Sequence, residues 1–365
     1  MENSKQTSKN QSGVFRKRTV AIAFFAMGIF ATLLIFTIRG KISIGANGAL
    51  PHENGPSDVN IYNIQRLKGF QNIQPVVTVG PQEESVRMQP LKNELITLID
   101  SLKTVGMADN VSVYLKNFKR GGWISVNEKE AFHPASLMKV PLMLAVLKTA
   151  ENSPGLLEKK IVYHKMPGKT MFQQHFQGPG IMEGQTYSVH DLIYYCAANS
   201  DNNATHALET NIDLSKVINL FNDIGLPKPE LQNADYTISA RDYSSFMESI
   251  FNSAFLGPEY SEYAAEMLVN CHFKEGFSKG LPAGTKVWHK FGEWTRAGVP
   301  DVELHESGTI FIDGKPYLLT VMTRGKDLDK LALSLQKIAA LVSNRLYKLP
   351  VSIARAAWYA NGMNC

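Results

Sequence analysis

A serine and a lysine three positions apart are the side chains of this sequence best suited to chemistry. Ser136 and Lys139 stand at the head of an apolar run, residues 140–147. Because side chains at i and i+3 share one face of a helix, the amine of Lys139 is expected to reach the hydroxyl of Ser136. Pro134 and Ala135 indicate a helix start, where unpaired backbone N–H groups and the helix dipole favour a developing anion. The pair therefore predicts a serine nucleophile with a lysine beside it.

The same spacing occurs a second time in the chain. Ser334 and Lys337 lie within the periodic segment 331–346, where both are expected on a solvated helix face. The spacing alone does not show which pair is catalytic, so residues elsewhere in the chain must distinguish them.

Two further polar tripeptides follow Ser136 and have no counterpart after Ser334. Residues 200–202 read Ser-Asp-Asn at the end of a predicted helix, a composition that is also typical of an ordinary helix terminus. Residues 290–292 read Lys-Phe-Gly on a predicted strand, whereas a second Lys-x-Gly, at 274–276, lies in a loop-like stretch.

This order of motifs resembles the penicillin-recognising serine enzymes, the class A β-lactamases and the D,D-peptidases, which carry S-x-x-K, S-D-N and K-T-G. The resemblance covers about residues 91–346. Residues 238–242 (Ile-Ser-Ala-Arg-Asp) are similar to the segment that this family places after its omega loop, and residues 284–290 are similar to the strand before its third motif. The resemblance implies an α+β fold of the β-lactamase/D,D-peptidase type.

It also implies catalytic roles for four matching residues. Ser136 would be the acylated nucleophile and Lys139 its proton partner. Ser200 would pass a proton to the leaving group, and Lys290 would give positive charge to the substrate and to Ser200. A lysine serves as a base only when burial or a neighbouring cation lowers its pKa, and Lys290 is the expected neighbour of Lys139.

Three further positions would bind the substrate, namely Asn202, Gly292 and Glu293. Asn202 would hold the substrate amide. The backbone N–H groups of Ser136 and Glu293 would form the oxyanion hole, where loss of one donor typically costs about a hundredfold to a thousandfold in rate. Because backbone groups form this hole, no particular side chain is needed at position 293.

Two departures from the family concern deacylation and the binding of a carboxylate. In class A β-lactamases the glutamate that begins E-P-E-L-N activates the deacylating water, whereas residues 228–232 here read Lys-Pro-Glu-Leu-Gln. Lys228 stands where that base would be, and Glu230 is more simply an exposed loop acid. Phe291 replaces the Thr or Ser of K-T-G and removes a hydroxyl that binds the carboxylate of penicillins, for which Arg296 is the alternative cation. We therefore expect acylation to be better supported than release of the acyl group.

Apolar periodicity predicts the elements that must position these residues. Helices are expected at 91–105, 189–198, 214–224, 240–251, 261–269 and 328–346, and strands at 111–118, 123–126, 285–291, 308–312 and 317–323. The dipeptide Asp313-Gly314 predicts a turn between the last two strands. The order indicates one antiparallel sheet formed by both ends of the domain, flanked by helices and with an inserted helical lobe.

The first 90 residues differ in kind from the rest. Residues 19–38 carry no charge over 20 positions, long enough for one transmembrane helix, and the basic tail 1–18 predicts a cytoplasmic N-terminus. Residues 39–90, rich in Gly, Pro and Asn, are expected to be a linker to an extracytoplasmic hydrolase domain, 91–346, which a tail, 347–365, follows. A cleaved signal peptide is the alternative, but the apolar run exceeds the usual length of one.

Length, charge and cysteines narrow the function classes. At 365 residues with 44% hydrophobic content the chain can bury a full core. The formal charge of +5 comes from residues 1–41, which carry seven Lys or Arg and one Glu, so residues 42–365 sum to −1. Nucleic-acid binding is therefore not expected. The three cysteines fit no metal spacing, Cys196 is expected to be a buried packing residue, and no metal or other cofactor is expected.

Three functions stay open at this point. The first is a membrane-anchored extracytoplasmic serine hydrolase, acylated at Ser136 by a β-lactam or by a peptide-like amide or ester. The second, favoured by Lys228 and Phe291, is a slow-deacylating D,D-peptidase-like cell-wall enzyme or a penicillin-binding sensor. The third is a non-catalytic wall-binding module. The expected partners are a small-molecule or peptide-like substrate and the cytoplasmic membrane, through residues 19–38.

Overall fold

The computed structural model describes residues 69–73, 75, 84–153, 155–165, 174–211, 213, 215–227, 229 and 235–348. The predicted basic tail, the predicted membrane segment 19–38 and most of the predicted linker lie outside these residues, as do residues 349–365. Within the described part of the chain, no helix is both long enough and apolar enough to cross a membrane.

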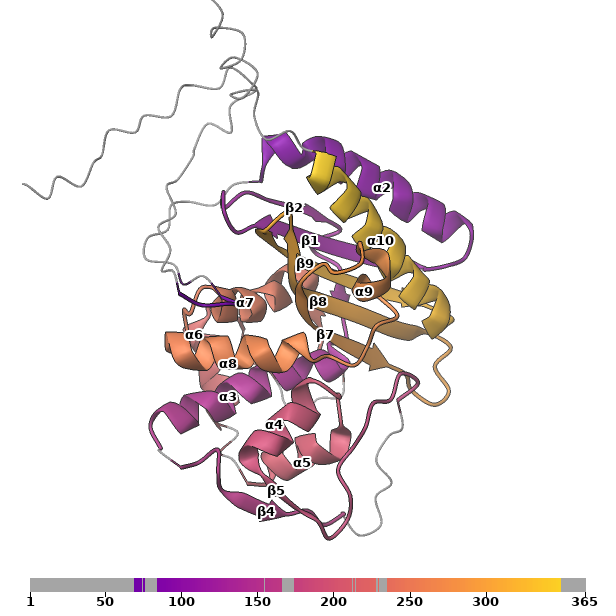
Figure 1. The fold of residues 1–365 in the computed structure, drawn as a ribbon. Helices are drawn as coiled ribbons and strands as arrows, with labels where there is room; N and C mark the ends of the chain where they lie inside the picture. The colour runs from indigo at the N-terminus through magenta and orange to yellow at the C-terminus, as the bar shows by residue number, and fades with distance from the viewer. Residues whose placement is uncertain are drawn as a thin grey trace, which may run out of the picture. The chain divides into compact units, whose positions relative to one another are not determined.

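A five-stranded antiparallel sheet with the strand order β2-β1-β9-β8-β7 forms the centre of the fold (Figure 1). Its strands are β1 (Asn110–Asn117), β2 (Trp123–Val126), β7 (Val287–Trp294), β8 (Val302–Ile312) and β9 (Lys315–Gly325). Strand β1 pairs with β9 along its whole length, so the two ends of the domain meet in one sheet, as the sequence predicted. Asp313 and Gly314 both have positive φ between β8 and β9, which confirms the predicted turn.

Strand β8 starts earlier than the sequence predicted. It begins at Val302 rather than at residue 308. This part of the strand contains the polar residues Glu303, His305 and Glu306, which are typical of a loop. Each of them is at most 1% exposed. Ion pairing inside the fold makes burial of such side chains tolerable, and hydrophobic periodicity cannot reveal it.

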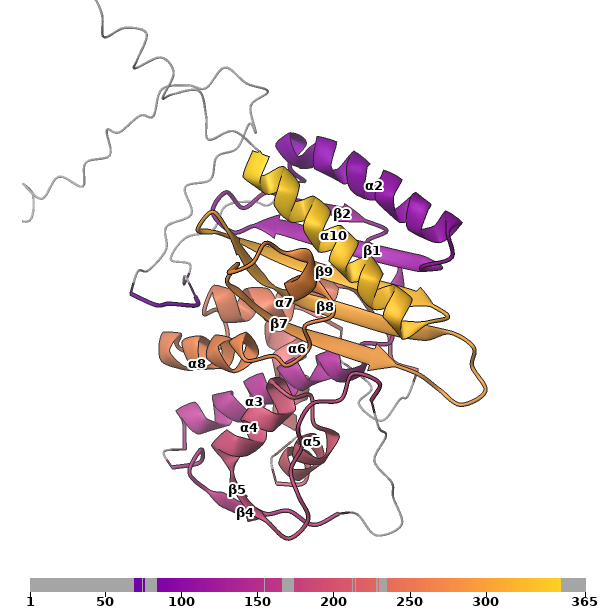
Figure 2. The ribbon, with the colours of Figure 1, turned by 45° about the vertical axis from the view of Figure 1, so that its right-hand side comes forward.

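Helices cover both faces of the sheet (Figures 1 and 2). The first and last long helices, α2 (Gln89–Thr104) and α10 (Leu328–Lys348), lie side by side on one face, and α7 (Ala240–Phe251) and α8 (Pro258–Val269) pack on the other. The helical lobe contains α3 (Lys139–Glu151), α4 (Val189–Ala197), α5 (Asn202–Glu209) and α6 (Ser215–Asp223). The α+β fold with a helical lobe is therefore confirmed, while α5, a helix of two turns, was not predicted.

Short elements complete the described fold. They are the 3-10 helices η1 (Val86–Met88) and η2 (Ala135–Met138), the helical turn α9 (Phe277–Gly280), and the two-stranded pairs β3 (Ala131–Phe132) with β6 (Ile238–Ser239) and β4 (Lys160–Val162) with β5 (Thr186–Ser188).

The sheet is buried on both faces because its strands alternate between two hydrophobic clusters. On β9, Leu318 and Met322 belong to the cluster shared with the helical lobe, whereas Leu319 and Val321 belong to the cluster beneath α2 and α10. This is the two-residue period of a strand with apolar cover on each side. The sheet is therefore a fixed frame for residues carried on its strands.

Part of the predicted linker belongs to the folded unit. Ile73 is 1% exposed, and the backbone N–H groups of Asn72 and Ile73 donate to the carboxylate of Glu262. The indole of Trp288, on β7, donates to the carbonyl of Asn72. The sequence did not indicate these contacts, because isolated buried residues within a Gly- and Pro-rich stretch leave no periodic signal.

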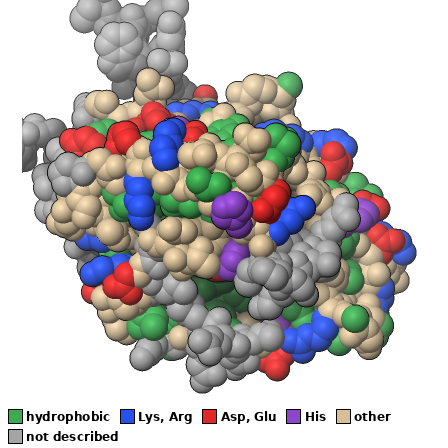
Figure 3. Space-filling view, turned by 90° about the horizontal axis from the view of Figure 1, so that it is seen from below, with side chains coloured by type: hydrophobic (Ala, Val, Ile, Leu, Met, Phe, Trp, Pro, Cys, Tyr) green, Lys and Arg blue, Asp and Glu red, His purple; other side chains and the backbone are tan. Residues whose placement is uncertain are grey.

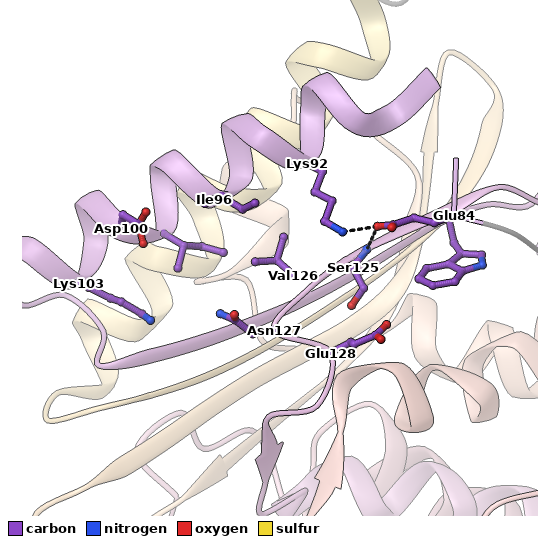
Figure 4. A pocket seen from close by; sticks show the side chains of 11 residues that line it. Glu84, Lys92, Ile96, Asp100, Lys103, Ser125, Val126, Asn127 and Glu128 are labelled. Carbon is purple, nitrogen blue, oxygen red and sulfur yellow. Dashed lines mark hydrogen bonds and ion pairs between the residues drawn. The ribbon is translucent and has the colours of Figure 1, made fainter. Parts of the chain in front are cut away.

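Two surface grooves lie away from the predicted catalytic residues. One, of about 390 Å³, runs between α2 and the edge strand β2, where Lys92 pairs with Glu84 at one end (Figure 4). The other, of about 640 Å³, is lined by residues around β6 and the start of α7. On the face seen in Figure 3, acidic and basic side chains are intermingled and the surface is hollowed beside histidine side chains.

Candidate active site

The nucleophile candidate lies on a 3-10 turn that precedes helix α3. Ala135 has a φ of 49°, a backbone conformation that costs energy for a residue with a side chain and that is common at functional sites. In the 3-10 helix that follows, side chains at i and i+3 eclipse one another. The Nζ atom of Lys139 accordingly lies 2.8 Å from the Oγ atom of Ser136, which confirms the contact expected from their spacing.

Lys139 also joins the first motif to the second. Its Nζ donates to the carbonyl of Ser200 at 2.8 Å and to Oδ1 of Asn202 at 2.7 Å, and it lies 3.3 Å from Oγ of Ser200. The side chain is 5% exposed, and this burial lowers the pKa of Lys139 to about 8. About a tenth of the side chain is therefore the free amine at pH 7, far more than for an ordinary lysine, and this is the form that can accept a proton from a serine.

Two residues of the Ser-Asp-Asn tripeptide contact Lys139, and the third caps helix α5. Ser200 has a φ of 56°, a left-handed turn that directs the chain from α4 into α5. The carboxylate of Asp201 caps α5 by accepting from the backbone N–H groups of Asn203 and Ala204, and it also accepts from Ile181. Asp201 is thus an ordinary helix-capping residue, while Ser200 and Asn202 contact the amine of Lys139.

The third motif approaches the nucleophile through its glycine. A Cβ atom on Gly292 would lie 2.8 Å from the carbonyl oxygen of Pro134 and 2.9 Å from the backbone nitrogen of Leu137, closer than real contacts allow. Strand β7 therefore packs its bare backbone against the turn that carries Ser136. This approach is the arrangement that an oxyanion hole shared by Ser136 and Glu293 requires.

Lys290 is fully buried beside this strand. Burial, together with the charge of Lys139, lowers the pKa of Lys290 to about 7. Among the described residues its Nζ donates to the carbonyl of Phe291 at 2.8 Å and not to Ser200. The charge of Lys139 thus acts on Lys290, whereas the lowered pKa of Lys139 comes from its burial and not from Lys290 as predicted. The expected contact between Lys290 and Ser200 is not formed.

Phe291 is a packing residue. Its ring stacks on Phe273, with the centroids 4.5 Å apart and an angle of 18° between the planes, in the cluster beneath α2 and α10. His289, two residues earlier and also fully buried, has its Nδ1 atom 2.6 Å from Oε1 of Glu306. The side chain at 291 therefore supplies core volume and offers no hydroxyl to a substrate. Arg296 pairs with Asp235 at 2.8 Å.

Gln174, which belongs to no motif, contacts the candidate nucleophile. Nε2 of Gln174 donates to Oγ of Ser136 at 2.7 Å and lies 3.4 Å from Oγ of Ser200. The next two residues, His175 and Phe176, donate their backbone N–H groups to the carboxylate of Glu293 at 2.5 and 3.0 Å. The sequence required no particular side chain at position 293, yet the carboxylate of Glu293 holds the segment that covers Ser136.

A buried ion pair supports the nucleophile turn from behind. The carboxylate of Glu303, on β8, accepts from the backbone N–H of His133 at 2.8 Å and from Nε of Arg324, on β9, at 2.7 Å. Burial alone would raise its pKa, but hydrogen bonds and charge from His305 and Arg324 hold the pKa of Glu303 at about 2. The ring of His133 stacks on Trp294 at 4.1 Å. The residue just before the turn that carries Ser136 is therefore held by strands β7 and β8.

Other candidates contribute nothing that can be placed at the site. Lys228 and Glu230 lie outside the described residues. Cys196 is buried, as expected, and accepts from the hydroxyl of Thr205. In the described part of the chain, no group of three His, Cys, Asp or Glu side chains could hold a metal ion.

The fold and the site together define a class of protein. Ser136 contacts a buried lysine of lowered pKa and lies next to the backbone of an edge strand. This arrangement is typical of serine hydrolases that work by acyl transfer. The family model described as the beta-lactamase enzyme family matches residues 91–348. The chain belongs to this family.

Solved structures share this fold. A beta lactamase from Xanthomonas campestris pv. campestris has a TM-score of 0.59 at 18% identity, over 70% of this chain and 98% of that one. PBP-A has a TM-score of 0.59 at 18% identity over 74% and 100%, and TLA-3 extended-spectrum beta-lactamase has 0.59 at 18% over 69% and 99%. No curated protein sequence matches the chain.

Proposed function

We propose that this protein is a membrane-anchored, extracytoplasmic serine hydrolase that is acylated at Ser136 by an amide or ester. The observation that carries the proposal is the 2.8 Å contact between Oγ of Ser136 and the amine of Lys139, whose pKa burial lowers to about 8. The anchor would be residues 19–38, with the basic tail 1–18 in the cytoplasm.

Acylation in this site follows from the contacts around Lys139. The free amine accepts the proton of Ser136 as Oγ attacks the substrate carbonyl, and the backbone N–H groups of Ser136 and Glu293 receive the developing oxyanion. Oγ of Ser200, 3.3 Å from the same amine, passes the proton on to the leaving group. Asn202 orients both Lys139 and the substrate amide, and Lys290 supplies positive charge close by.

The substrate class we propose is a β-lactam or a peptide-like amide. A solved structure of a PBP-A mutant is an acyl-enzyme complex with penicillin G, and this chain shares its fold. Phe291 offers no hydroxyl for a penicillin carboxylate. The carboxylate of Glu293, whose backbone N–H is proposed to bind the oxyanion, already accepts two backbone N–H groups and is not free to activate a water. These two observations favour, as the second candidate, a slow-deacylating D,D-peptidase-like enzyme or penicillin-binding sensor.

The test is covalent labelling of the full-length chain with a fluorescent penicillin and with a fluorophosphonate. We expect one adduct by intact mass in the wild type and in the control Ser334→Ala, and none in Ser136→Ala. The adduct should fractionate with membranes and should become soluble when residues 1–41 are deleted. Persistence of the mass for hours indicates the slow-deacylating candidate, and rapid multiple turnover excludes it.

Failure to label with either reagent across a pH series would contradict the proposal. Binding to cell-wall material that survives Ser136→Ala, in a protein that never labels, would instead support a non-catalytic wall-binding module.

A further inference from the structure

The carboxamide of Gln174 occupies the position that a substrate needs. Its nitrogen is 2.7 Å from Oγ of Ser136 and 3.4 Å from Oγ of Ser200, and the side chain is 7% exposed. In acyl transfer from an amide, the leaving nitrogen must lie next to the attacking oxygen and within reach of the proton donor. Nε2 of Gln174 sits between these same two hydroxyls, so a bound substrate and this side chain exclude one another.

The contact also engages the nucleophile electronically. A serine oxygen has two acceptor lone pairs and one proton to donate. In the resting state Lys139 and Gln174 both donate to Oγ of Ser136, so both lone pairs are engaged. When Lys139 instead accepts the serine proton, one lone pair becomes free, but Gln174 still holds the other and stands where the substrate must enter. Attack therefore requires Gln174 to leave.

Glu293 holds Gln174 in this position through the backbone that follows it. Its buried carboxylate accepts from the N–H groups of His175 and Phe176. The Phe176 carbonyl lies 2.9 Å from Nε2 of His272, and the Phe176 ring packs edge-on against Phe273. The segment 174–176 is thus fastened to the strand whose backbone N–H is proposed to bind the oxyanion.

We propose that Gln174 is a gate on acylation, with Glu293 as its positioning residue. In the resting enzyme the carboxamide fills the leaving-group position, and only substrates that displace it are attacked. This inference rests on the proposed acylation of Ser136. It makes the segment 174–176 a determinant of which amides and esters react and how fast.

The experiment compares second-order acylation rate constants with a fluorescent penicillin in the full-length protein. Gln174→Ala should acylate about tenfold faster, the scale of one net hydrogen bond removed from the resting state. Glu293→Gln keeps the side-chain volume but loses the charge that holds the segment, and should acylate faster by a smaller factor. The exposed Gln185 provides the matched control, since Gln185→Ala should leave the rate unchanged.

A double variant separates gating from loosening of the fold. Gln174→Ala with Glu293→Gln should react no faster than Gln174→Ala alone, because both changes remove the same obstacle. General damage to the site would slow the reaction in each variant, so a gain in rate cannot come from a merely structural role.

Each outcome decides between the gate and the proposed function. Labelling of the wild type together with an equal or slower rate in Gln174→Ala overturns the gate and leaves the proposed function intact. Labelling of Gln174→Ala but not of the wild type supports both. A resting wild-type mass lower by one ammonia shows that Ser136 has attacked Gln174 itself, which overturns the gate, and no labelling of any variant overturns both proposals.

Discussion

The chain carries the spacing Ser-x-x-Lys twice, and the two copies have opposite surroundings. Ser334 and Lys337 lie in the regular helix α10, where the hydroxyl of Ser334 donates back to the carbonyl of Lys330 at 2.9 Å and the side chain of Lys337 is exposed. The prediction that Ser334 is solvated was wrong, since its side chain is fully buried. Ser136 and Lys139 instead meet at the junction of a 3-10 turn with α3.

The difference lies in what other elements bring to each pair. Lys139 is enclosed by the turn between α4 and α5, whose Ser200 and Asn202 accept from its amine, and burial there lowers the pKa of Lys139. The side chain of Lys337 is exposed to water, and the hydroxyl proton of Ser334 is donated within its own helix. Reactivity thus depends on segments that lie far from the pair in sequence.

Removing each lysine gives the largest expected contrast. Lys139→Met should lower the acylation rate constant by about a thousandfold, within the range usual for loss of a general base. Lys337→Met should change it by less than about twofold, as is usual for an exposed site away from the chemistry. Stopped-flow or quenched labelling with a fluorescent penicillin measures both, and comparable losses in the two variants would show that the Lys139 contact is not catalytic.

The pH dependence should sharpen the comparison further. If Lys139 acts as the free amine and Lys290 as the cation, pKa values of about 8 and about 7 give a bell-shaped rate profile with its maximum between them. The two limbs belong to the coupled pair, and each should fall by about tenfold per pH unit. Lys290→Arg keeps its charge at all these pH values, so its profile should lose the alkaline limb.

The control for that profile is Lys337→Arg, which should keep the whole bell. A profile that stays flat between pH 6 and pH 9 in the wild type would argue against lysine as the proton acceptor.

The smallest effect is expected at the second serine. Ser334→Ala removes a hydroxyl that only bonds back to its own helix, and alanine is the better helix former. The free energy of unfolding should therefore change by less than about 1 kcal/mol, as measured from the urea midpoint at constant slope, and labelling should be unchanged. A loss of labelling in this variant would mean that the two pairs are not independent.

The sequence predicted the parts of this site that depend on order and local spacing. The contact of Ser136 with Lys139 follows from helical geometry, and the strand pairs β1–β2 and β8–β9 follow from alternation and turn residues. Gln174 and the side chain of Glu293 could not be found in this way. The amide of Gln174 contacts a residue 38 positions away, and the carboxylate of Glu293 contacts one 118 positions away. Neither residue type marks a motif.

Gly292 makes the turn that carries Ser136 rigid. With no side chain between them, the backbone of β7 and the turn from Pro134 to Leu137 touch directly, and Glu303 fastens the same turn to β8 and β9. Ser136 thereby shares the stiffness of a five-stranded sheet covered on both faces. Little reorganisation is needed at the proposed oxyanion position during reaction, so adjustment to different substrates is left to the side chain of Gln174.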